Sequence, residues 1–389
     1  MYFFPQYARH MANTDLTVKG IFEFKPAAKC VDRDAVGKAI ADSFLRCAVD
    51  NPSIDVPPGN DVWTNLYQNQ HREIIEFIRS YDLNAIIDYF ENIHEKSFTT
   101  GILDTGLNPD ETARNSWALT ICSRLTAIAE SLGAIPLYNP FASPGVCNAP
   151  PDLNMYQYDL NHLLSLIEQK LGRDILLPDV FNGFGIKTYR GIITDRIGRA
   201  LLTACQIKNY CHLLSIDFRT AKLCEIGGGG GMLAYFCWQL GARNYTIFDL
   251  PTTNILQNYF LLNALPTAKI VTYDRYEGIE NGCINILPYW KISDCLPGYA
   301  DLFINEDSMP EIDRNIVLSY LDYIKAFSRY FLSLNQECNA VMKDGNMLAR
   351  VYELIEESGG FERLLRQLHW GMPGYSVELY RVVQPNQMT

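Results

Sequence analysis

The residues best suited to bind a ligand form an acidic, glycine-rich turn. Leu223 to Ile226 are typical of a buried strand, and this strand runs directly into five consecutive glycines, Gly227 to Gly231, before an apolar helix. Five glycines cost much backbone entropy, which is tolerated where the chain must turn at φ angles closed to other residues. The absence of Cβ atoms also lets a ligand approach the backbone. The turn therefore predicts a small-molecule site, although a flexible loop without a ligand is the simpler alternative.

The spacing of the glycines bears on which cofactor class the turn would hold. The dinucleotide pattern G-x-G-x-x-G/A fits poorly, because frames starting at Gly227 and Gly228 place Met232 and Leu233 last. We judge the frame starting at Gly229 to be one residue too long. The pattern acidic-x-G-x-G-x-G fits without strain, and its members are Glu225, Gly227, Gly229 and Gly231.

Two more acids follow predicted strands in positions that suit a nucleoside. Asp249 and Leu250 end the second strand, where a carboxylate can accept both ribose hydroxyls. That position serves NAD equally well, and a surface acid before Pro251 is the alternative. Asp274 ends the third predicted strand, from which a side chain could reach an adenine amino group. These residues indicate nucleoside binding without choosing the cofactor.

The glycine turn resembles the nucleotide-binding turn of class I S-adenosylmethionine (SAM)-dependent methyltransferases. Three further segments are similar to the sugar O-methyltransferase family within that class, so the resemblance covers about residues 160 to 389. These segments are TDRIGRALLTACQI, ADLFINEDSMPEI and WGMPGYSVELYRVV. The resemblance implies SAM as cofactor and methyl transfer to a hydroxyl of a sugar or sugar-containing metabolite. It also implies that Glu225 pairs with the ammonium of the methionine part.

Transfer to a sugar hydroxyl needs a positioned base, because the hydroxyl is a weak acid and a poor nucleophile. The candidates are Glu306 and Asp307 at the end of the fourth strand, of which we favour Asp307, and His369 near the C-terminus. Asp307 could instead cap the turn before Pro310, and His369 could be a packing residue. Asn305 is expected to contact either the backbone or the cofactor. Adjacent strand positions point to opposite faces, so one of Glu306 and Asp307 should face the cofactor.

An arginine upstream of the first strand could neutralise the carboxylate of the cofactor. Tyr189 and Arg190 lie on a segment that passes over this group in the class I methyltransferase fold. A surface arginine that covers an interdomain seam is the alternative.

The elements that must position these residues change in type along the chain. Periodic apolar residues predict helices at 33–49, within 61–96, and at 111–132, 156–171 and 190–215. Proline-rich stretches at 51–61 and 134–155, and a breaker region at 178–191, interrupt them. After residue 220, strands are expected at 221–226, 244–250, 268–274, 300–307 and 330–337, followed by an antiparallel pair at the C-terminus.

This order predicts an α/β fold with two domains. A mainly helical cap or acceptor-binding domain would span 1–185, and a SAM-binding domain would span 186–389. The second domain would hold a doubly wound, Rossmann-like methyltransferase sheet, mostly parallel with an antiparallel C-terminal strand.

Composition limits the partners and the cellular location. Hydrophobic residues make up 48% and charged residues 20%, which suits a folded protein, and the net charge of −11 argues against nucleic acid as the main partner. The chain carries no apolar run long enough to cross a bilayer and no signal-peptide layout. We therefore expect a cytoplasmic protein with a small-molecule acceptor, no nucleic-acid or membrane partner, and an oligomeric state compatible with a homodimer.

Cysteine and histidine spacing argues against a metal site or a disulfide framework. The 11 cysteines include no C-x-x-C pair, and the six histidines show no ligand spacing, so we expect no protein-held transition metal. Two other functions stay open beside the methyltransferase. They are a non-catalytic SAM-binding or partner-binding subunit, and an oxidoreductase of the dinucleotide type.

Overall fold

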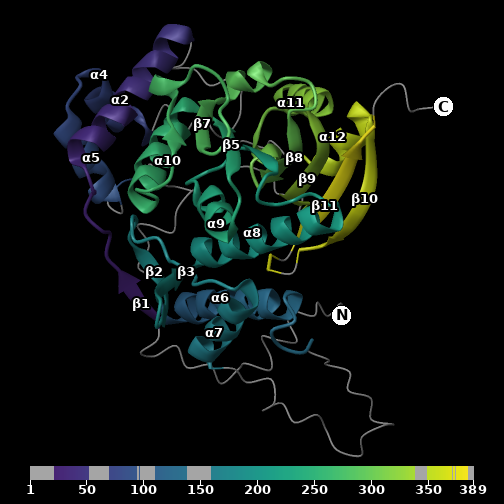
Figure 1. Cartoon of the computed structure of the whole chain (residues 1–389). Coiled ribbons are helices and arrows are strands. Elements are labelled where there is room, and N and C mark those ends of the chain that lie inside the picture. The colour runs from purple at the N-terminus through teal and green to yellow at the C-terminus, as the bar shows by residue number, and fades with distance from the viewer. Residues whose placement is uncertain are drawn as a thin grey trace, which may run out of the picture.

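The computed structural model describes residues 22–51, 70–93, 96, 110–137, 159–337, 348–369, 371, 372 and 374–383 (Figure 1). The α-helices of this part are α2 (Arg33–Asp50), α4 (Arg72–Arg79), α5 (Leu83–Glu91), α6 (Glu111–Ser131), α7 (Leu160–Leu171), α8 (Asp195–Leu213), α9 (Met232–Leu240), α10 (Pro251–Ala264), α11 (Arg314–Phe327) and α12 (Val351–Ser358). Its strands are β1 (Phe22–Lys25), β2 (Gly183–Thr188), β3 (Gly191–Thr194), β4 (Lys222–Ile226), β5 (Asn244–Asp249), β6 (Ile270–Val271), β7 (Ile284–Pro288), β8 (Ala300–Glu306), β9 (Ser328–Gln336), β10 (Phe361–Leu368) and β11 (Tyr375–Val382).

The main sheet has eight strands in the order β10-β11-β9-β8-β4-β5-β7-β6. The strands from β9 to β6 are parallel to one another, whereas β11 is antiparallel to both β9 and β10. The predicted α/β class is thus confirmed, as is the antiparallel pair at the C-terminus. The order along the chain reverses around β4, which creates the switch point where open α/β sheets bind ligands.

The third predicted strand is shorter than expected, and an unpredicted strand takes its place in the sheet. β6 covers only Ile270–Val271, and Asp274 lies in the short 3-10 helix η4 (Tyr273–Arg275). On the side away from β4, the neighbour of β5 is β7, which the sequence reading missed. As a result, Asp274 does not follow the strand beside β5, where the adenine contact was expected.

The predicted breaker region upstream of α8 is a small antiparallel sheet. β2 pairs with β1 on one side and with β3 on the other, and Tyr189 and Arg190 form the turn between β2 and β3. The helix expected to begin at 190 begins at Asp195, where the Thr194 side chain accepts from the N–H of Ile197. The expected domain boundary at 185–186 falls inside β2.

The helices before β2 pack on two sides of the main sheet domain (Figure 1). α2 packs against α10 and η4, whereas α6 packs against α8. Asp110 caps the start of α6, since its side chain accepts from the N–H of Ala113 at 2.8 Å. The two proline-rich stretches lie almost entirely outside the described residues, as do Trp63 and Leu66 of the helix expected from residue 61.

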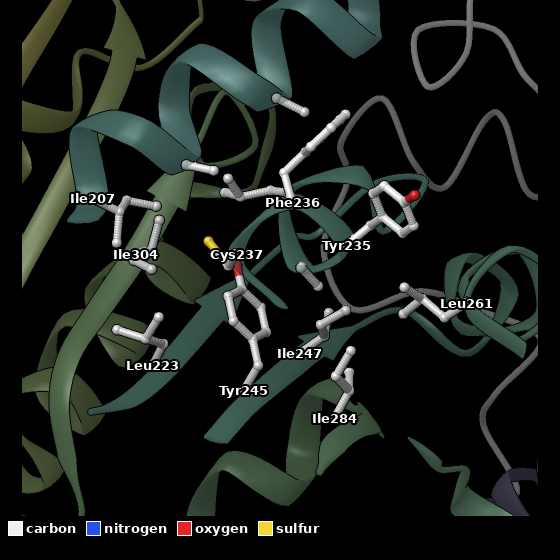
Figure 2. Packing of buried hydrophobic residues seen from close by; sticks show 14 of the residues in the cluster. Ile207, Leu223, Tyr235, Phe236, Cys237, Tyr245, Ile247, Leu261, Ile284 and Ile304 are labelled. Atoms are coloured by element: carbon white, nitrogen blue, oxygen red, sulfur yellow. The ribbon is translucent and has the colours of Figure 1, made fainter. Parts of the chain in front are cut away.

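A continuous cluster of buried apolar side chains joins the sheet to the helices on both of its faces. Figure 2 shows part of it, where Cys237 of α9 lies beside Tyr245 of β5. The described cysteines other than Cys30 are buried, and all of them are free thiols. This packing holds the ends of β4, β5 and β8 in fixed relation to one another.

Candidate functional site

A cavity lies at the carboxyl ends of β4, β5 and β8, at the switch point of the sheet. Its described lining residues all fall between Arg196 and Tyr320. Five of its side chains are acidic, namely Glu225, Asp249, Glu306, Asp307 and Glu311, and two are basic, namely Arg196 and Arg199. The remaining lining comes from Gly227–Gly230 and from apolar and hydroxyl side chains that include Phe248, Leu250, Thr253, Ser308, Ile312, Ile316 and Tyr320.

The glycine turn forms one wall of this cavity and needs its glycines for two physical reasons. Gly227, Gly229 and Gly231 have φ angles of 74°, 50° and 81°, in the left-handed region that side chains disfavour. A Cβ on Gly227 would lie 2.1 Å from the Ser308 Oγ, and one on Gly228 would lie 2.7 Å from Ile247. The backbone of the turn is therefore packed against its neighbours and is not a loose loop.

Two N–H groups of the turn donate to backbone carbonyls. The N–H of Gly227 donates to the Phe248 carbonyl at 3.0 Å, and that of Gly231 donates to the Gly228 carbonyl at 2.9 Å. The N–H groups of Gly228 and Gly229 favour the charged form of Asp249. A diphosphate at the turn would have to compete with this carboxylate.

Two buried carboxylates flank the turn. Burial raises the pKa of Glu225 to about 8, partly opposed by the Tyr245 hydroxyl, which donates to its Oε2 at 2.9 Å. Burial likewise raises the pKa of Asp249 to about 7, although the N–H of Leu250 and the Gln257 amide donate to it at 2.7 and 2.8 Å. Both carboxylates line the cavity, so a cationic ligand there would stabilise their charged forms.

Arg199 on α8 holds the two acids at the end of β8. Its Nε donates to the Glu306 Oε1 at 2.7 Å and its Nη1 donates to the Asp307 Oδ2 at 3.1 Å. Thr203 also donates to the Glu306 Oε1, and the Tyr375 hydroxyl donates to the Asp307 Oδ1 at 2.7 Å. Burial opposes a charge on Arg199, but the two carboxylates outweigh it and raise the guanidinium pKa above its ordinary value.

Both Glu306 and Asp307 line the cavity, although alternation along a strand predicted only one of them. The reason is that β8 ends at Glu306 and Asp307 has a φ of 63°. This left-handed conformation is uncommon for a residue other than glycine, and such residues cluster at functional sites. The turn thereby brings two adjacent carboxylates to the same space.

Asn305 and Ser308 connect the end of β8 to the end of β4. The Asn305 amide donates to the Ile226 carbonyl at 2.9 Å, and Asn305 is fully buried and does not line the cavity. Ser308 donates to the same carbonyl at 3.2 Å and lines the cavity opposite Gly227. Asn305 thus fixes the shape of the site from behind.

The remaining expected site residues lie outside the cavity lining. Asp274 accepts from the Ser43 hydroxyl at 2.9 Å, which ties η4 to α2. Arg190 pairs with Glu168 at 2.8 Å and with Asp174, and Tyr189 also donates to Glu168. The polar groups of these side chains are thus engaged with other parts of the protein, and their contact with a ligand stays a prediction.

His369 is buried behind the acidic pair and faces no described lining residue through a hydrogen bond. Its Nδ1 accepts from the N–H of Gly371 at 3.1 Å, and its Nε2 has no partner among the described residues. Burial, followed by the charges of Arg199 and Arg124, lowers the pKa of His369 to about 3. The imidazole is therefore neutral and a weak base at ordinary pH.

The sequence reading missed the two arginines of the cavity and the lining residues that follow Ser308, among them Ile312, Ile316 and Tyr320. Arg196 and Arg199 lie three residues apart in TDRIGRALLTACQI, a spacing that places both on one face of a helix. That spacing was visible, but which face of α8 meets the cavity was not. Within the described residues, no group of three or more His, Cys, Asp or Glu side chains could hold a metal ion, and no described helix is long and apolar enough to cross a membrane.

No protein-family model and no curated protein sequence matches the chain. Solved structures that match it include magnesium protoporphyrin IX methyltransferase from Synechocystis PCC 6803 with bound SAH, at 12% identity and a TM-score of 0.35, covering 48% of this chain and 85% of that one. A second match is ribosomal protein L11 methylase from Lactobacillus delbrueckii subsp. bulgaricus, at 11% identity and a TM-score of 0.31, covering 48% of this chain and 80% of that one. A third is an S-adenosylmethionine-dependent methyltransferase from Mesorhizobium loti, at 11% identity and a TM-score of 0.29, covering 44% of this chain and 96% of that one. Because these TM-scores are below 0.5, the fold assignment rests on the strand order of the chain itself.

Proposed function

We propose that the protein is a SAM-dependent methyltransferase that methylates a hydroxyl of a sugar or sugar-containing metabolite. The observation that carries the proposal is a side-chain-free turn that borders a cavity lined by five acidic and two basic side chains. SAM brings a sulfonium and an ammonium with only one carboxylate, so an acidic cavity complements its charge. A dinucleotide brings a diphosphate, which the same cavity would repel.

The charge of the cavity discriminates the cofactor class better than glycine spacing does. The frame that starts at Gly229 ends at Ala234 and satisfies G-x-G-x-x-A, so our rejection of that frame was wrong. The stronger argument is that no basic side chain lies within the turn, and that two of its N–H groups, those of Gly227 and Gly231, already donate to backbone carbonyls. In dinucleotide sites the N–H groups of the turn are the donors to the diphosphate.

Within this proposal, the two buried carboxylates hold the two polar ends of the cofactor. Glu225 pairs with the ammonium, because its carboxylate lies beside the turn and a cation would offset the cost of its burial. Asp249 accepts the ribose hydroxyls at the end of β5. Leu250 and Phe248, which line the cavity next to Asp249, supply apolar surface for the adenine ring of the cofactor.

The acceptor is proposed to bind between the acidic pair and the wall formed by α11. Ile312, Ile316 and Tyr320 offer the apolar and aromatic surface that the C–H face of a sugar prefers, and the carboxylates accept its hydroxyl protons. In the reaction, the hydroxyl oxygen attacks the methyl carbon as the carbon–sulfur bond breaks. The sulfur keeps the bonding electrons, and the proton passes from the hydroxyl to the Asp307 carboxylate. The products are the methyl ether and S-adenosylhomocysteine.

The role of the N-terminal half stays a prediction. We propose that residues before 186 form a cap that closes over the acceptor and excludes water. The cytoplasmic location, the absence of a nucleic-acid partner and the homodimer are proposals of the same kind.

Two measurements test the function in sequence. Isothermal titration should give saturable binding of SAM and none of NAD. The purified protein is then incubated with CD3-labelled SAM and an extract of the source cells, and mass spectrometry should reveal a labelled glycan or sugar nucleotide. Binding of NAD in place of SAM would contradict the proposal.

One observation favours a non-catalytic SAM-binding subunit as the second candidate. Arg199 donates to both Glu306 and Asp307, which leaves neither acid free of a cationic partner. If SAM binds but no labelled product forms in any source extract, this second function is the better account.

A further inference from the structure

We propose that Arg199, supported by Arg196, binds the carboxylate of the cofactor and sets the preference of the site for an intact amino-acid group. The inference rests on the proposed function, since it concerns the same cavity. It assigns to α8 the role that sequence reasoning gave to Arg190. SAM carries one carboxylate, and Arg196 and Arg199 are the basic side chains among the described residues that line the cavity.

Arg199 is already oriented for such a contact. Two carboxylates fix its Nε and Nη1, while its Nη2 has no partner among the described residues. The side chain is 11% exposed and lines the cavity. A guanidinium whose other donors are held in place loses little freedom when its remaining N–H groups bind a ligand.

The surroundings of Arg199 match the two charges of an amino-acid group. The carboxylate of Glu306, which Arg199 contacts, is close enough to Glu225 to raise the pKa of that residue further. The strand pairing gives the geometry, since Glu225 of β4 lies opposite Ile304 of the neighbouring strand β8, two residues before Glu306. The proposed ammonium site at Glu225 therefore lies beside the strand end whose Glu306 holds the guanidinium of Arg199. A zwitterion needs an anion and a cation placed side by side, and these residues provide both.

Arg190 cannot serve this role in the observed arrangement. Its guanidinium pairs with Glu168 and Asp174, and it does not line the cavity. Arg196 lies one helical turn before Arg199 and does line it, so both arginines of α8 present their side chains to the same space.

The test compares SAM with decarboxylated SAM, which keeps the sulfonium and the amine and lacks only the carboxylate. Isothermal titration should show that the wild-type protein prefers SAM by about 10- to 100-fold, the range for a charge-assisted hydrogen bond. In Arg199→Met, this ratio should fall to within about threefold of unity, because SAM binding weakens and binding of decarboxylated SAM does not. Arg199→Lys should give an intermediate ratio, since lysine keeps the positive charge but lacks the planar guanidinium that donates two parallel hydrogen bonds to a carboxylate.

Controls separate this inference from folding effects and from the proposed function. Arg190→Met, at the residue that sequence reasoning favoured, should keep the wild-type ratio. Thermal unfolding of each variant identifies any that fails to fold, and Arg196→Met then reports on the same carboxylate. The inference is overturned if the wild-type protein binds both ligands equally, or if the folded α8 variants keep the wild-type ratio. Failure of the wild-type protein to bind either ligand would instead refute the proposed function.

Discussion

At the scale of single residues, Asp307 is the proposed proton acceptor of the reaction. It lines the cavity in a left-handed conformation, with its two oxygens accepting from Tyr375 and Arg199. Removing its charge while keeping its shape, in Asp307→Asn, should lower turnover by about 100-fold or more, the usual worth of a general base. The affinity for SAM should stay within about fivefold, because Glu306 still holds the Nε of Arg199, the proposed carboxylate contact. Turnover is measured as the initial rate of label transfer, and a rate equal to that of wild type would remove Asp307 from the mechanism.

Gly227 should tolerate no side chain, because its surroundings exclude a Cβ as well as its backbone angle. Alanine at this position would lie 2.1 Å from the Ser308 Oγ. Gly282 is a matched control, since its φ of 73° is almost the same and nothing lies within 4 Å. Gly282→Ala should cost about 1–2 kcal/mol of unfolding free energy through its backbone angle alone. Gly227→Ala should cost about 1–3 kcal/mol more.

Chemical denaturation measures both glycine variants, and a second substitution tests the cause. Ser308→Gly in the Gly227→Ala background should recover most of the extra loss, because it removes the clashing atoms. Equal costs for Gly227→Ala and Gly282→Ala would show that the contact with Ser308 relaxes freely.

At the scale of elements, the residues around β4 could be predicted better than those around β2 and β7. The apolar run of β4 leads straight into glycines with positive φ, so local sequence determines both the strand and the turn. The sequence reading missed β7 because no α-helix separates it from β6, and the reading relied on strands alternating with α-helices. In β2, Gly185 suggested a break, yet a Cβ there would lie 2.2 Å from the Ile193 carbonyl of β3. That glycine permits a close approach of two strands, which only the paired structure reveals.

Contacts between elements also decided which predicted residues reach the cavity. Asp274 is held by Ser43 of α2, and Arg190 is held by Glu168 of α7. Both side chains have the chemistry that a cofactor contact requires, so composition alone could not exclude them. Arg196 and Arg199 reach the cavity because α8 turns one face toward it.

The contact between α2 and η4 gives a prediction at this scale. Asp274→Ala should lower the unfolding free energy by about 1–2 kcal/mol, because it leaves the Ser43 hydroxyl without its acceptor. Ser43→Ala should lower the unfolding free energy less in the Asp274→Ala variant than in the wild-type protein, since the shared side-chain hydrogen bond is already lost. SAM affinity should stay within about twofold of wild type, which calorimetry can measure. A tenfold weaker affinity would return Asp274 to the cofactor site.

At the scale of the whole molecule, the cavity concentrates buried acids in the centre of the sheet. Glu225 and Asp249 both have pKa values raised by burial, and both lie at strand ends that the continuous apolar core fixes in place. Without a bound cation, their charged forms are costly to the fold. A cationic ligand bound in the cavity should therefore stabilise the folded protein.

This arrangement makes the stability of the ligand-free protein depend on pH. The folded pKa of Glu225, about 8, lies above the ordinary value of 4.5. The folded protein therefore binds this proton more tightly than the unfolded chain does. The stability from Glu225 is fully present below its ordinary pKa and is lost as pH rises through about 8. The loss should be on the order of a few kcal/mol.

Glu225→Gln isolates this contribution, because the amide keeps the shape of the side chain and cannot ionise. Denaturation curves from pH 5 to 9 should show the wild-type protein losing stability relative to Glu225→Gln as the pH rises. Saturating SAM should reduce that relative loss, because its ammonium stabilises the carboxylate of Glu225 in the wild-type protein and finds no charge in the variant. The difference in unfolding free energy between the two proteins could instead stay constant from pH 5 to 9. That result would mean that Glu225 is ionised throughout this range, with a counter-charge already in place. In that case the cavity would have no need of a cationic ligand, and the electrostatic argument for SAM would fail.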